Sequence, residues 1–128
     1  MTDASNPMTE RGLAVRRDVL GTEYVDDALN KARPAAGRFQ HLVSTYCWGE
    51  LWSDDTLDRR QRSLINVAMI AALGRAAELR LHVRGAVRNG CTEAEINEAL
   101  MHAAVYAGIP AGVEGFRIAK EVLEAEGM

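Results

Sequence analysis

The stretch that decides the fold is Leu57-Asp58-Arg59-Arg60-Gln61-Arg62-Ser63-Leu64-Ile65-Asn66-Val67-Ala68-Met69-Ile70-Ala71-Ala72-Leu73-Gly74. Three arginines lie near its start, and between residues 64 and 73 Asn66 is the only polar residue. A helix that is apolar on every side has no solvent face, so it belongs in the middle of a bundle or of an oligomer. Arginines in a first turn lie at the positive end of the helix dipole. We therefore expect an anion beside them, which is either a bound carboxylate or the nearby Asp54, Asp55 and Asp58.

The rest of the chain predicts more helices and no strand. Apolar residues recur at helical spacing, and no alternating segment is long enough for a strand. Thr9 is the expected cap of the first helix, Thr92 and Glu95 form a capping box, and Gly49 is expected to end a helix after Trp48. The fold class is therefore all-α, with six or seven helices. The predicted helices outside the central stretch span residues 9–20, 23–31, 35–48, 76–89 and 93–107, and a last helix begins at Pro110 and includes Leu123.

Length and composition set the broad class of protein. The 128 residues predict a flexible tail over 1–7 and a single helical domain over 8–128. The net charge is -3 and no segment is strongly basic, which argues against a nucleic acid or a membrane as partner. No apolar run reaches about 18 residues and no signal peptide precedes the domain, so we expect a soluble, cytoplasmic protein. Cys47 and Cys91 form no CxxC motif and are expected to be buried reduced thiols.

Few residues in this sequence have the spacing of a chemical site. The three histidines form no pair at metal-ligand spacing, so we expect no metal, and no glycine-rich phosphate loop is present. Glu78 and His82 are four residues apart on one helix face, where a carboxylate can orient an imidazole for acid–base chemistry. Arg59 and Arg62 form a candidate anion site. An isolated histidine on a helix is more often structural than catalytic, and an arginine cluster of this kind is usually a solvated, ion-paired turn.

Two tryptophans flank a glycine in the segment before the central stretch. Trp48 and Trp52 belong to a chain in which only 5% of the residues are aromatic. Their rings either cover a helix end or form the apolar wall of a pocket whose mouth carries the arginines. The sequence leaves both readings open.

Several of these segments together resemble the carboxymuconolactone decarboxylase family. The resemblance extends from Phe39 to Val122. It is carried by the segments 46–52, 57–64, 68–75, 78–90 and 105–111. It implies an all-helical fold and assembly as a homotrimer or homohexamer, which would explain a central helix that is apolar on every side.

The resemblance also implies a reaction, the decarboxylation of 4-carboxymuconolactone to β-ketoadipate enol-lactone and CO2 in protocatechuate catabolism. The departing carboxylate is vinylogous to the lactone carbonyl, so the substrate supplies its own electron sink and no cofactor is expected. Arg59 and Arg62 would then bind the remote carboxylate, and His82, oriented by Glu78, would donate a proton to carbon. The remaining residues expected to contact the substrate are Trp48, Trp52, Tyr46, Ser63 and Tyr106.

The same superfamily contains AhpD-type thiol peroxidases, with a CxxC motif four residues before a histidine. Here Arg75 and Glu78 occupy the cysteine positions and Ser63 that of a glutamate, which disfavours a peroxidase. Two segments depart from the decarboxylase pattern, namely 54–56, where an Arg-Pro-Gly-like turn is expected, and 113–114. The alternatives are therefore a decarboxylase or isomerase acting on a different lactone or keto acid, and a non-catalytic oligomeric protein.

Overall fold

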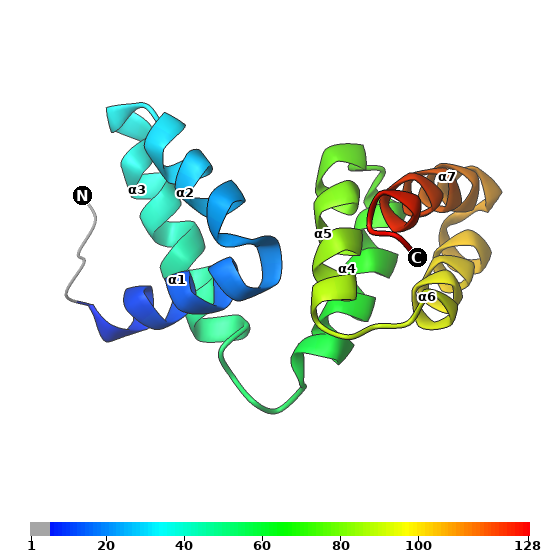
Figure 1. Cartoon of the computed structure of the whole chain (residues 1–128), viewed down its shortest axis with the longest axis horizontal. Coiled ribbons are helices and arrows are strands. Elements are labelled where there is room, and N and C mark those ends of the chain that lie inside the picture. Colours follow the sequence, from blue (N-terminus) through cyan, green and yellow to red (C-terminus); the bar gives the residue numbers. More distant parts are fainter. Residues whose placement is uncertain (1–5) are drawn as a thin grey trace. The chain divides into compact units, whose positions relative to one another are not determined.

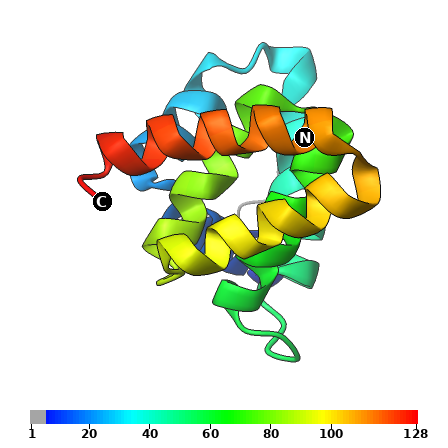
Figure 2. The same cartoon turned by 90° about the vertical axis from the view of Figure 1, so that its right-hand side faces the viewer.

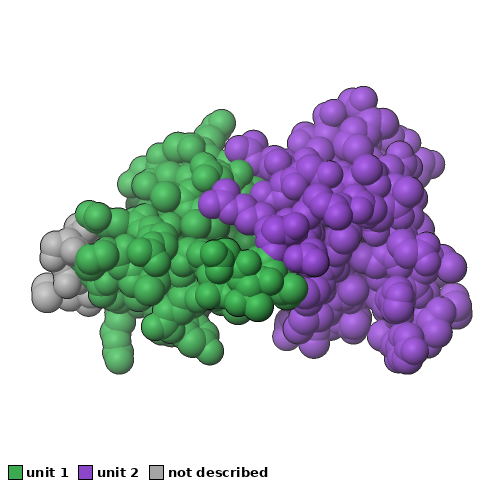
Figure 3. Space-filling view, turned by 90° about the horizontal axis from the view of Figure 1, so that it is seen from below, with its two compact units in different colours: residues 1–57 green, residues 58–128 purple. Residues whose placement is uncertain are grey.

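In the computed structural model, which describes residues 6–128, the chain is all-α (Figure 1). Its two compact units are Met1–Leu57 and Asp58–Met128 (Figure 3). Within residues 6–128 there is no strand, so the predicted fold class is confirmed. Among those residues no helix is long and apolar enough to cross a membrane. The assignment of 8–128 to a single domain stays a prediction.

The first unit contains short and partly irregular helices. Its helical elements are α1 (Pro7–Leu20), α2 (Thr22–Lys31), a 3-10 turn (Pro34–Ala36), α3 (Gly37–Leu42) and a π-helix (Val43–Leu51). The prediction that Gly49 ends a helix is wrong, because the π-helix continues past it to Leu51. Gly49 lies against the first turn of α1, where an added Cβ would lie 2.6 Å from the Met8 carbonyl oxygen. Close tertiary packing therefore explains this glycine better than helix termination does.

The start of α1 also differs from the prediction. Asn6 caps this helix, since its side-chain oxygen accepts a 2.9 Å hydrogen bond from the Met8 N–H. Thr9, the predicted cap, is buried, and its hydroxyl lies 2.7 Å from the hydroxyl of Thr45 on the π-helix. Pro7 already belongs to the helix, so the predicted tail is one residue too long. Residues 1–5 of that tail lie outside the described part of the chain.

The second unit contains α4 (Arg59–Leu73), α5 (Ala76–Arg88), α6 (Glu93–Ala107) and α7 (Ile109–Ala125). Gly74 is left-handed and ends α4, and Gly108 separates α6 from α7, which pack as a hairpin (Figure 2). An added Cβ at Gly112 would lie 2.6 Å from the Ala104 Cβ, so this glycine lets α7 approach α6 closely. The core takes apolar residues from all four helices, including Val67, Leu79, Val83, Ile96, Leu100 and Ile118.

The central helix is not surrounded by apolar partners on every side. Val67 and Ala71 are buried in the core, but Ile65, Met69 and Leu73 are 44%, 56% and 67% exposed. These three residues recur every fourth position, so they form one stripe along α4. The helix therefore has a core face and an exposed apolar face.

Candidate active site

The first turn of α4 presents the candidate anion-binding arginines. Asp58 caps the helix by accepting a 2.7 Å hydrogen bond from the Gln61 N–H, and Gln61 Oε1 accepts a 2.9 Å bond from the Asp58 N–H. This capping box supplies the carboxylate expected at the positive end of the helix. Arg59 is exposed, whereas Arg62 is only 8% exposed. Two arginines three residues apart thus combine one accessible and one buried guanidinium.

The end of α5 fixes this turn from one side. Asn89 Nδ2 donates a 2.9 Å hydrogen bond to Ser63 Oγ and a longer one, 3.4 Å, to the carbonyl oxygen of Arg59. Ser63 was expected to contact substrate, but its side chain is fully buried and its hydroxyl accepts the bond from Asn89. In this structure Ser63 therefore helps to position the arginines. The sequence marked Asn89 only as a helix end and did not single it out.

The start of α6 fixes the same turn from another side. Arg60 forms an ion pair with Glu95, and Cys91 Sγ lies 3.5 Å from the Arg60 carbonyl oxygen. Glu95 also accepts a 2.9 Å bond from the Thr92 N–H, completing the predicted capping box. The Thr92 backbone bond and then the Arg60 side chain lower the pKa of Glu95. The connection from Asn89 to Thr92 therefore holds the arginine turn against both α5 and α6.

His82 lies on the middle of α5. Burial lowers its pKa from 6.5 to about 4, so the imidazole is neutral at pH 7. Glu78 is exposed and does not contribute to this shift. His82 and Asn89 are seven residues apart on one helix face, which is about 10 Å along the axis. The imidazole and the arginine turn therefore belong to one antiparallel helix pair, at different levels.

The aromatic candidates lie on separate elements. Trp48 and Trp52 are both 3% exposed, and their rings stack with centroids 4.8 Å apart in the first unit. Tyr46, two positions before Trp48, is 67% exposed. Tyr106 is 86% exposed, and its ring stacks on that of His102 at 6.1 Å along α6. Within the second unit, Tyr106 therefore belongs to the exposed face of α6 and not to the buried α4–α5 contact.

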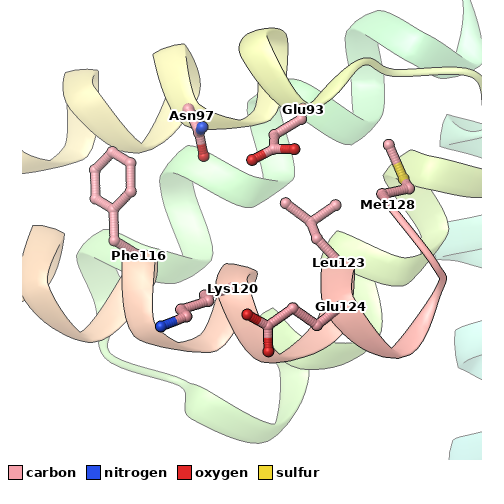
Figure 4. A pocket seen from close by; sticks show the side chains of 7 residues that line it. All are labelled: Glu93, Asn97, Phe116, Lys120, Leu123, Glu124 and Met128. Carbon is pink, nitrogen blue, oxygen red and sulfur yellow. The ribbon is translucent and has the colours of Figure 1, made fainter.

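Neither of two hollows formed by residues of the second unit is lined by a predicted site residue. A cavity of about 450 Å³ lies between α6 and α7, and Figure 4 shows two carboxylates, Glu93 and Glu124, among its walls. An apolar groove of about 400 Å³ runs between α4 and α6, with His102 at its side. Among residues 6–128 no group of three histidine, cysteine, aspartate or glutamate side chains is placed to hold a metal ion.

Comparison with known proteins shows the family. The carboxymuconolactone decarboxylase family profile matches residues 37–121. The chain is 42% identical over 127 residues to a nitrosuccinic acid decarboxylase of Metarhizium robertsii, covering 95% of this chain and 89% of the relative. It is 40% identical over 119 residues to a 4-carboxymuconolactone decarboxylase of Acinetobacter baylyi, covering 93% and 89%. These decarboxylase relatives support a carboxy-lyase activity in general. The chain belongs to the carboxymuconolactone decarboxylase family.

Proposed function

We propose that this protein decarboxylates a small dicarboxylic acid without a cofactor, with 4-carboxymuconolactone as the first candidate substrate and β-ketoadipate enol-lactone and CO2 as products. The observation that carries the proposal is the α4–α5 helix pair, which bears both the arginine turn and a half-buried, neutral imidazole. A guanidinium fork suits the carboxylate that the product retains. The desolvation of the imidazole suits the loss of charge as CO2 departs.

Because its pKa is lowered, His82 can act as the proton donor only if it first takes up a proton. A neutral imidazole is a poor acid toward carbon. With its pKa lowered from 6.5 to about 4, His82 has no extra proton to donate at neutral pH before the substrate binds. A dianionic substrate near His82 favours the imidazolium and raises its pKa. We therefore infer that His82 takes up one proton from solvent as the substrate binds. After the C–C bond breaks and CO2 leaves, this proton is transferred to the carbanionic carbon and the imidazole becomes neutral again.

The first experiment is an assay of CO2 release from enzymatically generated 4-carboxymuconolactone, with a chelator present. We expect turnover by the wild type and a fall in kcat of about 10²–10⁴-fold for His82→Gln. The control is His102→Gln, because His102 is exposed on α6. Turnover by His82→Gln at the wild-type rate would remove His82 from the mechanism and leave the activity itself in place.

A second candidate substrate is a substituted succinic acid. The relative from Metarhizium robertsii is a nitrosuccinic acid decarboxylase, and its substrate is by name a succinic acid derivative. The acidic segment 54–56, which departs from the pattern expected for a carboxymuconolactone decarboxylase, favours a changed substrate. The same CO2 assay with nitrosuccinate, compared by kcat/KM, separates the two substrates.

We further propose that the protein assembles with copies of itself, as a homotrimer or homohexamer, through the exposed apolar stripe of α4. Val105 on α6 is 72% exposed and adds to the exposed apolar surface of this unit. Exposed apolar surface of this extent is typical of an interface. Sedimentation velocity tests the proposal, since Met69→Lys should lower the oligomeric state. Met128→Lys, a substitution of an equally accessible methionine, should not change it.

A further inference from the structure

A second arginine site lies in the first unit, at Arg16 on α1. Its side chain is only 6% exposed. Nη1 donates hydrogen bonds to Gln40 Oε1 at 3.1 Å and to Ser44 Oγ at 3.3 Å. Nε is buried and has no hydrogen-bond partner. Nη1 is thus in use, whereas Nε has no acceptor among residues 6–128.

Arg16 also has no counter-charge in the described part of the chain. Within residues 6–128 no carboxylate pairs with it, and Gln40 and Ser44 are neutral. The thiol of Cys47 lies nearby, but burial raises its pKa, so it keeps its proton at neutral pH. Burial lowers the pKa of Arg16, yet a guanidinium stays charged in proteins. The unit therefore buries a cation against neutral groups, an arrangement that costs stability unless an anion completes it.

We propose that Arg16, with Gln40 and Ser44, is a carboxylate-binding site for a dicarboxylic acid. A carboxylate can accept a hydrogen bond from the unpartnered Nε, and the guanidinium fork allows a second, parallel bond from Nη2. It would also neutralise the buried charge. Because Arg16 keeps so little exposed surface, the side chains over it must part for the ligand to enter and close again around it.

The proposal rests on the proposed function for the choice of ligand, since both candidate substrates carry two carboxylates. One carboxylate leaves as CO2, and a second must be held while it does so. Arg59 and Arg62 on α4 are the candidates for that role in the second unit, and Arg16 is a separate carboxylate site, in the first unit, that the sequence did not mark. Its adjacent residue, Arg17, is the natural contrast, because it pairs with Asp26 at 2.9 Å and is 36% exposed.

Succinate is a suitable probe, since it has two carboxylates and does not react. Binding is measured by titration calorimetry and by the fluorescence of Trp48 and Trp52, which both belong to the same unit as Arg16. We expect Arg16→Gln to weaken succinate binding at least tenfold. Arg16→Lys keeps the charge but loses the fork, so it should also weaken binding. Arg17→Gln is the matched control and should bind like the wild type.

A substitution at Gln40 tests the same idea without removing the arginine. Gln40→Glu places a carboxylate next to Nη1, so it supplies the missing counter-charge from within the chain. We expect the Tm without ligand to rise and succinate binding to weaken at least tenfold. A purely structural Arg16 predicts the higher Tm with no change in succinate binding, and that result would overturn the proposal. This variant also keeps the test decisive if Arg16→Gln does not fold.

The outcomes also separate this proposal from the proposed function. If CO2 is released and succinate binds equally well to wild type, Arg16→Lys and Gln40→Glu, the Arg16 site is wrong and the decarboxylase stands. If succinate binds through Arg16 but neither candidate substrate releases CO2, the site stands and the proposed reaction is wrong.

Discussion

The two units hold their helices in place by different means. In the second unit, α4 and α6 each begin with a full capping box, and apolar residues from α4, α5, α6 and α7 fill one core. In the first unit, α2 and α3 begin without a side-chain cap, and α3 leads directly into a π-helix. Contacts between α1 and the π-helix dominate there. Local signals and packing therefore agree in the second unit, while tertiary contacts decide the conformation in the first.

The two units also treat buried ionisable groups differently. Burial lowers the pKa of both Arg16 and His82. The imidazole responds by giving up its proton, whereas the guanidinium remains charged. Arg16 in the first unit therefore stays an internal cation and His82 in the second unit is a neutral base, so the two groups should respond differently to anions and to pH.

The largest effect is expected where α1 meets the π-helix. A Cβ added at Gly12 would overlap the Ser44 carbonyl oxygen and lie 2.7 Å from the Gly49 nitrogen, so backbone must shift. We expect Gly12→Ala to lower the free energy of unfolding by about 3 kcal/mol, measured by urea denaturation. Gly37→Ala is the control, since a Cβ there meets nothing within 4 Å. Equal stability of the two variants would mean that this contact does not hold the first unit together.

The stability of the second unit should depend on pH through His82. The unfolded imidazole of His82 titrates near pH 6.5 and the folded one near 4, so between these values the unfolded state binds more protons. Stability is therefore lost as the pH falls, by about 2 kcal/mol between pH 7 and pH 5 from this residue. Urea denaturation at the two pH values should show the loss in wild type and in His102→Gln, and less of it in His82→Gln. An unchanged pH dependence in His82→Gln would contradict the burial of a neutral imidazole.

A smaller effect is expected at the connection that holds the arginine turn. Asn89→Ala leaves the buried hydroxyl of Ser63 without its donor, which costs about 1.5 kcal/mol. KM should rise more than kcat falls, because Arg59 and Arg62 lose a positioning contact. In the background of Ser63→Ala the same substitution should cost less stability, as a double-mutant cycle can show. If the stability losses of Asn89→Ala and Ser63→Ala simply add, the hydrogen bond between the two side chains does not contribute to stability. Asn97→Ala on α6 is the control for loss of an amide.

The smallest effect concerns caps. Thr92→Ala removes the hydroxyl that accepts a 3.1 Å bond from the Glu95 N–H and should cost about 1 kcal/mol. Thr22→Ala, in the first turn of α2, should cost little, because no side-chain cap bond is present there. An equal loss of stability in Thr92→Ala and Thr22→Ala would contradict the idea that local capping stabilises α6 more than it stabilises α2.

The sequence was most informative where its signals are local. Helices α5 and α6 have nearly the bounds predicted, because Gly90 and the Thr92–Glu95 box act within one turn of the chain. The predictions for Thr9 and Gly49 were wrong for one reason. Both residues face a helix distant in sequence, and spacing along one helix cannot show what the other brings against it.

The sequence by itself determined the all-α class, most of the helices and the residues that carry the family resemblance. Only the tertiary structure showed that Ser63 is bonded to Asn89 and that burial keeps His82 neutral. It alone also revealed Arg16 as a buried cation without a counter-charge among residues 6–128. The physical reason is that periodicity and capping depend on neighbours a few residues away. Desolvation and hydrogen-bond satisfaction depend on groups tens of residues away.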